Sequence, residues 1–193
     1  MIKIQVILST TRQERRSEQI GKWVIAELKK NEDIEAELVD LKDWQLPFYN
    51  EVAGLLTLKR EQLSSDLAKK WQEKIDVADG YIIVTAEYNH GYPAVLKNAL
   101  DHGSRPFGSN SWGNKPAAII GISPSPIGTA LAQQHLRGIL ATLNMPTLCQ
   151  PEMFLQIKDS FFDEAGNIGE GSKQFLLHWI EIMIKWIRSH SSH

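Results

Sequence analysis

Apolar residues along the chain follow two patterns: short continuous runs, and longer stretches in which they recur every three or four positions. The continuous runs are rich in β-branched residues and predict buried strands at 2–8, 80–86 and 116–122. Residues 34–41 alternate like a strand, and further short strand segments are expected near 147–150 and at 153–157. The three-to-four-residue period predicts helices at 17–30, 66–78, 93–102, 128–143 and 170–188.

Strand and helix therefore alternate about five times along the chain. Alternation of this kind predicts an α/β protein, in which a parallel sheet carries helices on both faces as a three-layer sandwich. Five strands in 193 residues favour the flavodoxin-like strand order 2-1-3-4-5. We expect one domain over 1–188 and a flexible tail at 189–193. Ser17 is a favourable N-cap for the first helix, and Pro93 suits the first position of another.

Composition narrows the class of protein. Lys plus Arg number 21 and Asp plus Glu 23, so the net charge of −2 does not indicate nucleic acid or a membrane as a partner. The N-terminus does not resemble a signal peptide, and the apolar stretches are far shorter than the ~20 residues that span a bilayer. The single Cys149 excludes an internal disulfide and a multi-cysteine metal site, and we expect a buried structural thiol. A cytoplasmic protein without a metal site is predicted.

In a sheet of order 2-1-3-4-5, ligands bind beyond the carboxyl ends of strands 1 and 3, where the winding reverses. The loop after the first strand, 9–17, is suited to an anion, because a helix N-terminus follows it. Its hydroxyl groups, cations and following amides come from Ser9, Thr10, Thr11, Arg12, Arg15, Arg16, Ser17, Glu18, Gln19 and Ile20. The alternative is a polar, capped loop whose arginines are simply solvated.

The loop after the third long strand, 86–92, suits a flat conjugated ring. Tyr88 and Tyr92 offer aromatic walls, and the amides of Asn89, His90 and Gly91 offer polar contacts to the edge of a ring. Two alternatives stay open for this loop. Glu87 caps a following helix or bonds a backbone amide rather than touching a ligand, and His90 is a structural or solvent-exposed histidine. Trp44 and Trp112, in the long loops, are candidates for a subunit interface or a substrate mouth.

Two segments carry a resemblance to a known family. Ser9-Thr10-Thr11-Arg12, with Trp23 eleven residues after the arginine, and the run EYNHGYPAVLKNALD at 87–101 are similar to the NADPH-dependent FMN reductase family. The similarity extends through about residue 145. The chain departs from the usual family pattern at Ser9, at Ala86 and in the loop 123–128, where SPSPIG replaces a Gly-Gly pair and two prolines remove backbone donors.

The resemblance implies a flavodoxin-like fold, bound FMN, NADPH as reductant and a homodimer or homotetramer. It assigns the FMN phosphate to Thr10, Arg12, Ser17, Gln19 and Ile20, and the isoalloxazine edge to Glu87, Tyr88, Asn89 and His90. From the same three loops we add Ser9, Ala86, Gly91 and Ser123 as cofactor-binding candidates. Arg105 and Arg15 are candidates for the extra phosphate of NADPH.

The implied reaction is ping-pong hydride transfer through flavin N5 from NAD(P)H to a small acceptor: free flavin, a quinone, an azo compound or a metal oxyanion. The flavin supplies the chemistry, so no side chain is assigned a catalytic role. The alternative function is a flavodoxin-like electron carrier that binds FMN without turning over NADPH. A relative that has lost FMN is a third reading, which the altered loop 123–128 keeps open.

Overall fold

The computed structural model describes residues 1–51, 59–158, 161–163 and 167–191. Its centre is a five-stranded sheet in the order β2-β1-β3-β4-β5, in which every neighbouring pair is parallel. The strands are β1 (Ile2–Leu8), β2 (Ile34–Asp40), β3 (Gly80–Ala86), β4 (Ala117–Ser123) and β5 (Met153–Gln156). The predicted flavodoxin-like strand order is thereby confirmed.

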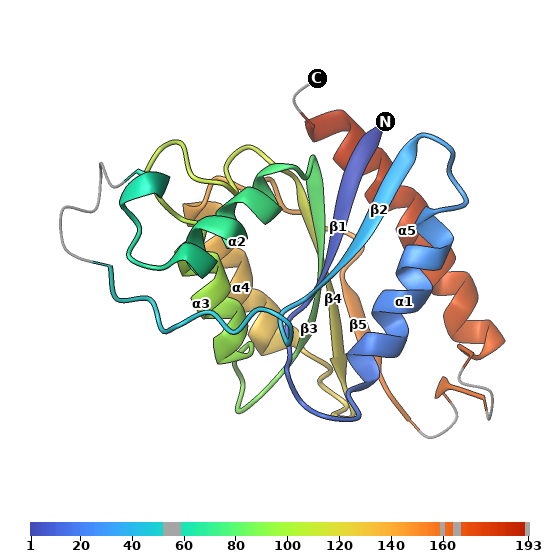
Figure 1. The fold of residues 1–193 in the computed structure, drawn as a ribbon. Coiled ribbons are helices and arrows are strands. Elements are labelled where there is room, and N and C mark those ends of the chain that lie inside the picture. Colours follow the sequence, from blue (N-terminus) through green and yellow to red (C-terminus); the bar gives the residue numbers. More distant parts are fainter. Residues whose placement is uncertain (52–58, 159–160, 164–166, 192–193) are drawn as a thin grey trace.

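Helices cover both faces of this sheet, which gives the predicted three layers (Figure 1). One face carries α1 (Arg16–Leu28) and α5 (Glu170–His190), and the other carries α2 (Asp66–Asp76), α3 (Ala94–His102) and α4 (Ala130–Thr142). Successive strand residues point to opposite faces. Ile82 and Val84 accordingly pack against α1 and α5, whereas Tyr81 and Ile83 pack against the other three helices.

A cluster of indole rings fills the face under α2 and α3. Trp71 lies 6.0 Å from Trp112 and 5.0 Å from Trp44 between ring centroids, each pair edge to face. The indole N–H of Trp71 donates to the Ala99 carbonyl at 2.8 Å, and that of Trp112 donates to the Leu100 carbonyl at 3.0 Å. Trp112 is 1% exposed, so its predicted place at a mouth or an interface is wrong; packing against Trp71 and Tyr81 buries it.

Several element boundaries differ from the prediction. The segment 147–150 is not a strand, because only Thr147 pairs with the sheet, as an isolated bridge to Ala117. Pro93 flanks α3 at its N-cap instead of occupying the first helical position. The last helix continues to His190, where the imidazole stacks on Trp186 at 3.7 Å between centroids, so the predicted tail begins two residues too early. Residues 192–193 of that tail lie outside the described residues.

The single thiol is placed differently from its prediction. Cys149 is exposed, because the segment that carries it leaves the sheet after the bridge at Thr147. In the described ranges, every helix is too short or too polar to cross a bilayer.

Candidate functional site

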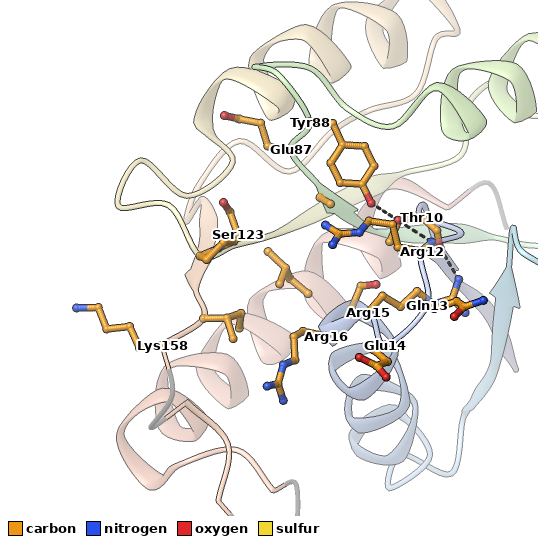
Figure 2. Close-up of a pocket in the computed structure, with 15 residues that line it drawn as sticks. Thr10, Arg12, Gln13, Glu14, Arg15, Arg16, Glu87, Tyr88, Ser123 and Lys158 are labelled. Carbon is orange, nitrogen blue, oxygen red and sulfur yellow. Dashed lines mark hydrogen bonds between the residues drawn. The ribbon is translucent and has the colours of Figure 1, made fainter.

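A cavity of about 410 Å³ lies at the carboxyl ends of β1, β3, β4 and β5, which are consecutive neighbours in the sheet. Residues 10 and 12–17 line it after β1, 86–88 after β3, 122–124 at the end of β4, and 157–158 after β5 (Figure 2). This is the edge at which the winding of the sheet reverses, where parallel α/β proteins bind their ligands. Its volume falls within the range of roughly 300–1,000 Å³ that is usual for small-molecule sites.

The cavity brings together about half of the residues predicted from the sequence. Its lining includes Thr10, Arg12, Ser17, Ala86, Glu87, Tyr88 and Ser123. The remaining candidates lie behind or beside it: Ser9, Gln19, Ile20, Asn89, His90 and Gly91. Ile20 belongs to the hydrophobic core under α1, so its side chain is not a ligand contact, although its amide still lies in the first turns of that helix.

The first loop holds polar atoms that the described residues do not satisfy. The Ser9 and Ser17 hydroxyls and the Gln19 amide oxygen are buried and have no hydrogen-bond partner in the described part of the chain. Buried polar atoms are normally paired. Within the described ranges, unpaired ones also occur away from the cavity, for example at His102 and Gln133, and Ser17 is distinguished from them because it lines the cavity. Ser17 lies in the first turn of α1 and lines the cavity, next to amides that a helix N-terminus leaves free.

The predicted N-cap role of Ser17 is wrong. Helix α1 begins at Arg16, with Arg15 in the N-cap position and no side chain bonded to the first amides. Because no side chain caps the helix, the positive end of its dipole stays open toward the cavity. An uncapped N-terminus beside an unpaired hydroxyl is suited to a phosphate group.

A hydrogen bond joins the first loop to the loop after β3. The hydroxyl groups of Thr10 and Tyr88 contact each other across the cavity, and Figure 2 shows this contact as a dashed line. The Arg12 guanidinium lies 5.9 Å from the centroid of the Tyr88 ring, within range of a cation–π interaction. Tyr88 therefore forms an aromatic wall whose position depends on both loops.

Residues 88–91 form a tight reverse turn at the rim. Tyr88 and Gly91 exchange two backbone hydrogen bonds, at 2.8 and 3.0 Å. Asn89 and His90 both have positive φ, 51° and 66°, as the two central residues of a type I′ turn do. This conformation is strained in residues other than glycine, and such strain is often found at functional sites. In the described chain, the Asn89 and His90 amides have no backbone acceptor, so they are available to a ligand.

Glu87 follows one of the alternatives stated for it. Its carboxylate accepts a hydrogen bond from the Ala132 amide at 2.9 Å, in the first turn of α4. Helix α4 has Thr129 at its N-cap without a side-chain bond, so Glu87 satisfies this end of the helix from another loop. Glu87 lines the cavity, and its carboxylate is already bonded to the N-terminal turn of α4.

Hydrogen bonds to Ser123 and from Gln156 on β5 hold the loop after β4. The Ser123 hydroxyl accepts from the Ser125 amide at 3.0 Å, and the Gln156 side chain donates to the Pro124 carbonyl at 3.3 Å. Ser123 is buried and lines the cavity together with Pro124 and Ile122. This side of the cavity is apolar compared with the first loop.

Sequence reasoning missed several lining residues: Gln13, Glu14, Ile122, Pro124, Ile157 and Lys158. Lys158 follows the carboxyl end of β5, and the topology alone could have suggested that position, since all parallel strands end at the same edge. Arg12, Arg16 and Lys158 form no ion pair with a carboxylate in the described residues, whereas Arg15 is paired with Asp40. The cavity thus combines three available cations with the open end of α1.

Comparison with known proteins points to one family. The sequence model of a family described as NADPH-dependent FMN reductase matches residues 2–158. A 2-hydroxy-1,4-benzoquinone reductase from Burkholderia sp. is 38% identical over 191 residues, 97% of each chain. A quinone reductase from Pseudomonas putida is 29% identical over 96% of this chain and 94% of its own. The structure of FerB, a flavoenzyme NAD(P)H:acceptor oxidoreductase from Paracoccus denitrificans, matches with a TM-score of 0.83 and 30% identity over all of both chains.

Proposed function

Because the chain belongs to the NADPH-dependent FMN reductase family, we propose that it holds FMN in the cavity at the carboxyl edge of the sheet and passes electrons from NAD(P)H to a quinone. The family is an oxidoreductase family that uses FMN and NAD(P)H, so the sequence resemblance and the enzyme class are confirmed. The observation that carries the proposed location is the unpaired Ser17 hydroxyl beside the uncapped N-terminus of α1.

The residues present fit FMN at both ends of the cavity. At the β1 side, the Ser17 hydroxyl, the α1 amides and the Arg12 guanidinium offer donors and charge to a phosphate. Toward β3 and β4, Tyr88, Ile122 and Pro124 provide the aromatic and apolar contacts that a flat ring needs. The amides of the turn 88–91 supply donors for the polar edge of that ring.

Bound FMN would supply the redox chemistry between a nicotinamide and an acceptor. The amides of Asn89 and His90 would stabilise negative charge on the ring, since fixed dipoles need no reorganisation. The Glu87 carboxylate accepts from the Ala132 amide on α4, which holds its negative charge away from the ring. The apolar side chains of Ile122 and Ile157 exclude water from one wall.

The acceptor class and the kinetic order are part of the proposal. Two relatives whose names specify quinone reduction, of which the Burkholderia enzyme is 38% identical, support a quinone as the acceptor. If the nicotinamide and the quinone both reach the flavin through this cavity, a ping-pong order is expected, in which the oxidised nicotinamide leaves before the quinone enters. The predicted dimer or tetramer and the cytoplasmic location stay predictions; light scattering of the purified protein tests the assembly.

The experiment begins with the protein loaded with FMN and freed of excess flavin. Anaerobic NADPH should bleach the visible flavin bands, and a benzoquinone added afterwards should restore them. Initial rates measured against NADPH concentration, at several fixed quinone concentrations, should give parallel lines in a double-reciprocal plot. Flavin that a chemical reductant bleaches and NADPH does not would make the protein an electron carrier. A protein that retains no flavin would contradict both functions. Riboflavin, which lacks the phosphate, is the control: its affinity compared with that of FMN measures what the phosphate contributes to binding.

A further inference from the structure

Arg15 lines the cavity, and its guanidinium is almost fully buried by contacts within the protein. The side chain is 4% exposed, although the neighbouring residues Arg12 and Arg16 are exposed. One guanidinium nitrogen donates to the Thr10 carbonyl, five residues earlier in the chain. The other donates to the Asp40 carboxylate and lies 3.6 Å from a Glu18 carboxylate oxygen. A single side chain thus contacts three separate segments.

These three segments are the ones that shape the anion-binding end of the cavity. Thr10 belongs to the loop after β1, Glu18 to the first turn of α1, and Asp40 is the last residue of β2. Asp40 is itself fixed, because its other carboxylate oxygen accepts from the Lys42 amide at 2.9 Å. Arg15 therefore anchors the loop and the start of α1 to the end of a strand that does not line the cavity.

The charge of Arg15 is offset within the protein. Asp40 and Glu18 bring two carboxylates to one guanidinium, so the group adds little net attraction for a phosphate. Its predicted role as a ligand of the NADPH phosphate does not fit a cation that is buried and already paired. The planar fork of an arginine can bond a carboxylate and a carbonyl at once, and a lysine ammonium cannot reproduce that geometry.

We propose that Arg15 is a positioning residue for the phosphate of FMN: it holds the loop 10–15 and the first turn of α1 in the arrangement that points the Ser17 hydroxyl and the α1 amides into the cavity. Thr10 belongs to this arrangement, since its carbonyl accepts a hydrogen bond from Arg15. The inference rests on the proposed function and adds to it a residue that acts through the segments it joins.

The test compares FMN with riboflavin, which lacks the phosphate, by quenching of flavin fluorescence. Arg15→Met and Arg15→Lys should each weaken FMN binding by ~10-fold, because each loses a charge-assisted hydrogen bond. Riboflavin affinity should change by less than about 2-fold in both variants, a pattern that a general loss of folding would not produce. A phosphate ligand that acted by charge alone would retain most of the FMN affinity in Arg15→Lys.

Asp40 provides a second variant and a coupling test. Asp40→Asn should weaken FMN binding in the same direction, and the double variant Arg15→Met/Asp40→Asn should bind FMN no more weakly than Arg15→Met. The control is Arg188→Met, which removes a more exposed arginine paired with Asp33 at 2.7 Å. Asp33 directly precedes the amino end of β2, and neither residue lines the cavity. That control should leave the affinities of both flavins unchanged.

The outcomes separate this inference from the proposed function. A wild-type protein that does not bind FMN contradicts the proposed function. A wild-type protein that binds FMN, with Arg15→Lys binding equally well, overturns the positioning role alone. Equal losses of FMN and riboflavin affinity in Arg15→Met also overturn it. If Arg15→Met does not fold, Asp40→Asn decides, because a carboxamide keeps the volume and still loses the charge.

Discussion

Buried polar groups are handled differently in two parts of the molecule. In the core beneath α2 and α3, the Trp71 and Trp112 N–H groups donate to backbone carbonyls, and the Tyr81 hydroxyl donates to the Ile75 carbonyl at 2.6 Å. At the carboxyl edge, the hydroxyls of Ser9 and Ser17 are equally buried and have no partner in the described residues. These three aromatic groups are satisfied by the chain itself, although His102 Nδ1 on α3 is also buried and unpaired within the described ranges. Ser17 differs from His102 because it lines the cavity, where the proposed phosphate would bind.

The largest effect should come from the core. Trp71→Ala removes a fully buried indole and its hydrogen bond to Ala99, and should lower the free energy of unfolding by about 3–5 kcal/mol. Urea unfolding followed by circular dichroism measures this loss. Val77→Ala is the control, because Val77 is 53% exposed just after α2, and its cost should stay below about 0.5 kcal/mol. Equal costs for the two variants would contradict the described packing.

Two serines sharpen the comparison, since they should respond with opposite signs. Ser17→Ala removes an unpaired hydroxyl, so the flavin-free protein should be unchanged or more stable by up to ~1 kcal/mol, while FMN affinity falls by ~10-fold. Ser65 caps α2 by accepting from the Ala68 amide at 3.3 Å. Ser65→Ala should cost ~1 kcal/mol of stability and leave FMN affinity unchanged. A stability loss in Ser17→Ala would mean that the protein already satisfies that hydroxyl.

Glu87 belongs to both regions, because it lines the cavity and is bonded like a core group. Glu87→Gln keeps an acceptor for Ala132 and removes the charge from the end of α4, so stability should fall by about 0.3–1 kcal/mol. The loss should shrink at high salt, which screens the interaction with the helix dipole. Thermal unfolding at low and high ionic strength measures both effects. A salt-independent loss would contradict this account.

The smallest effect concerns Lys115, which donates to the Ile75 and Asp76 carbonyls at the end of α2. Burial lowers the pKa of its ammonium from 10.5 to about 8. Between these values the unfolded chain holds a proton that the folded chain has released, so stability should rise as pH increases through that window. Partial exposure limits the gain to less than about 1 kcal/mol. Lys115→Met should lack this rise when unfolding is compared at pH 7.5 and 10; an identical slope would contradict the lowered pKa.

The sheet could be predicted because its strands have distinctive sequences. β1 and β3 coincide with the apolar runs 2–8 and 80–86, since central parallel strands must be apolar on both faces. The order of elements then limited the topology to a few possibilities. The segment 147–150 misled the prediction because a short apolar run does not reveal whether a partner strand reaches it; only Thr147 pairs.

The site was predicted in outline and missed in its detail. The topology located the loops after β1 and β3, but the sequence could not show that Arg15 folds back onto Thr10 and reaches Asp40, 25 residues later. Helix α1 also begins at Arg16, with Arg15 at its N-cap, so Ser17 has no capping role. Trp112 was expected near the surface and is buried, whereas Cys149 was expected to be buried and is exposed. Both differences have the same cause, because burial depends on packing between distant segments.

The placement of the indole rings has an optical consequence. All six tryptophans lie outside the cavity lining, and Trp44, Trp71 and Trp112 are gathered on the face away from α1. The ultraviolet emission of the flavin-free chain therefore reports how the two helical layers pack on the sheet, and a substitution such as Ser17→Ala leaves this emission unaltered. The visible emission of added FMN reports the cavity. Folding is therefore followed by the tryptophan emission of flavin-free samples, and occupancy of the cavity by the emission of FMN in separate samples, because bound flavin absorbs where tryptophan emits.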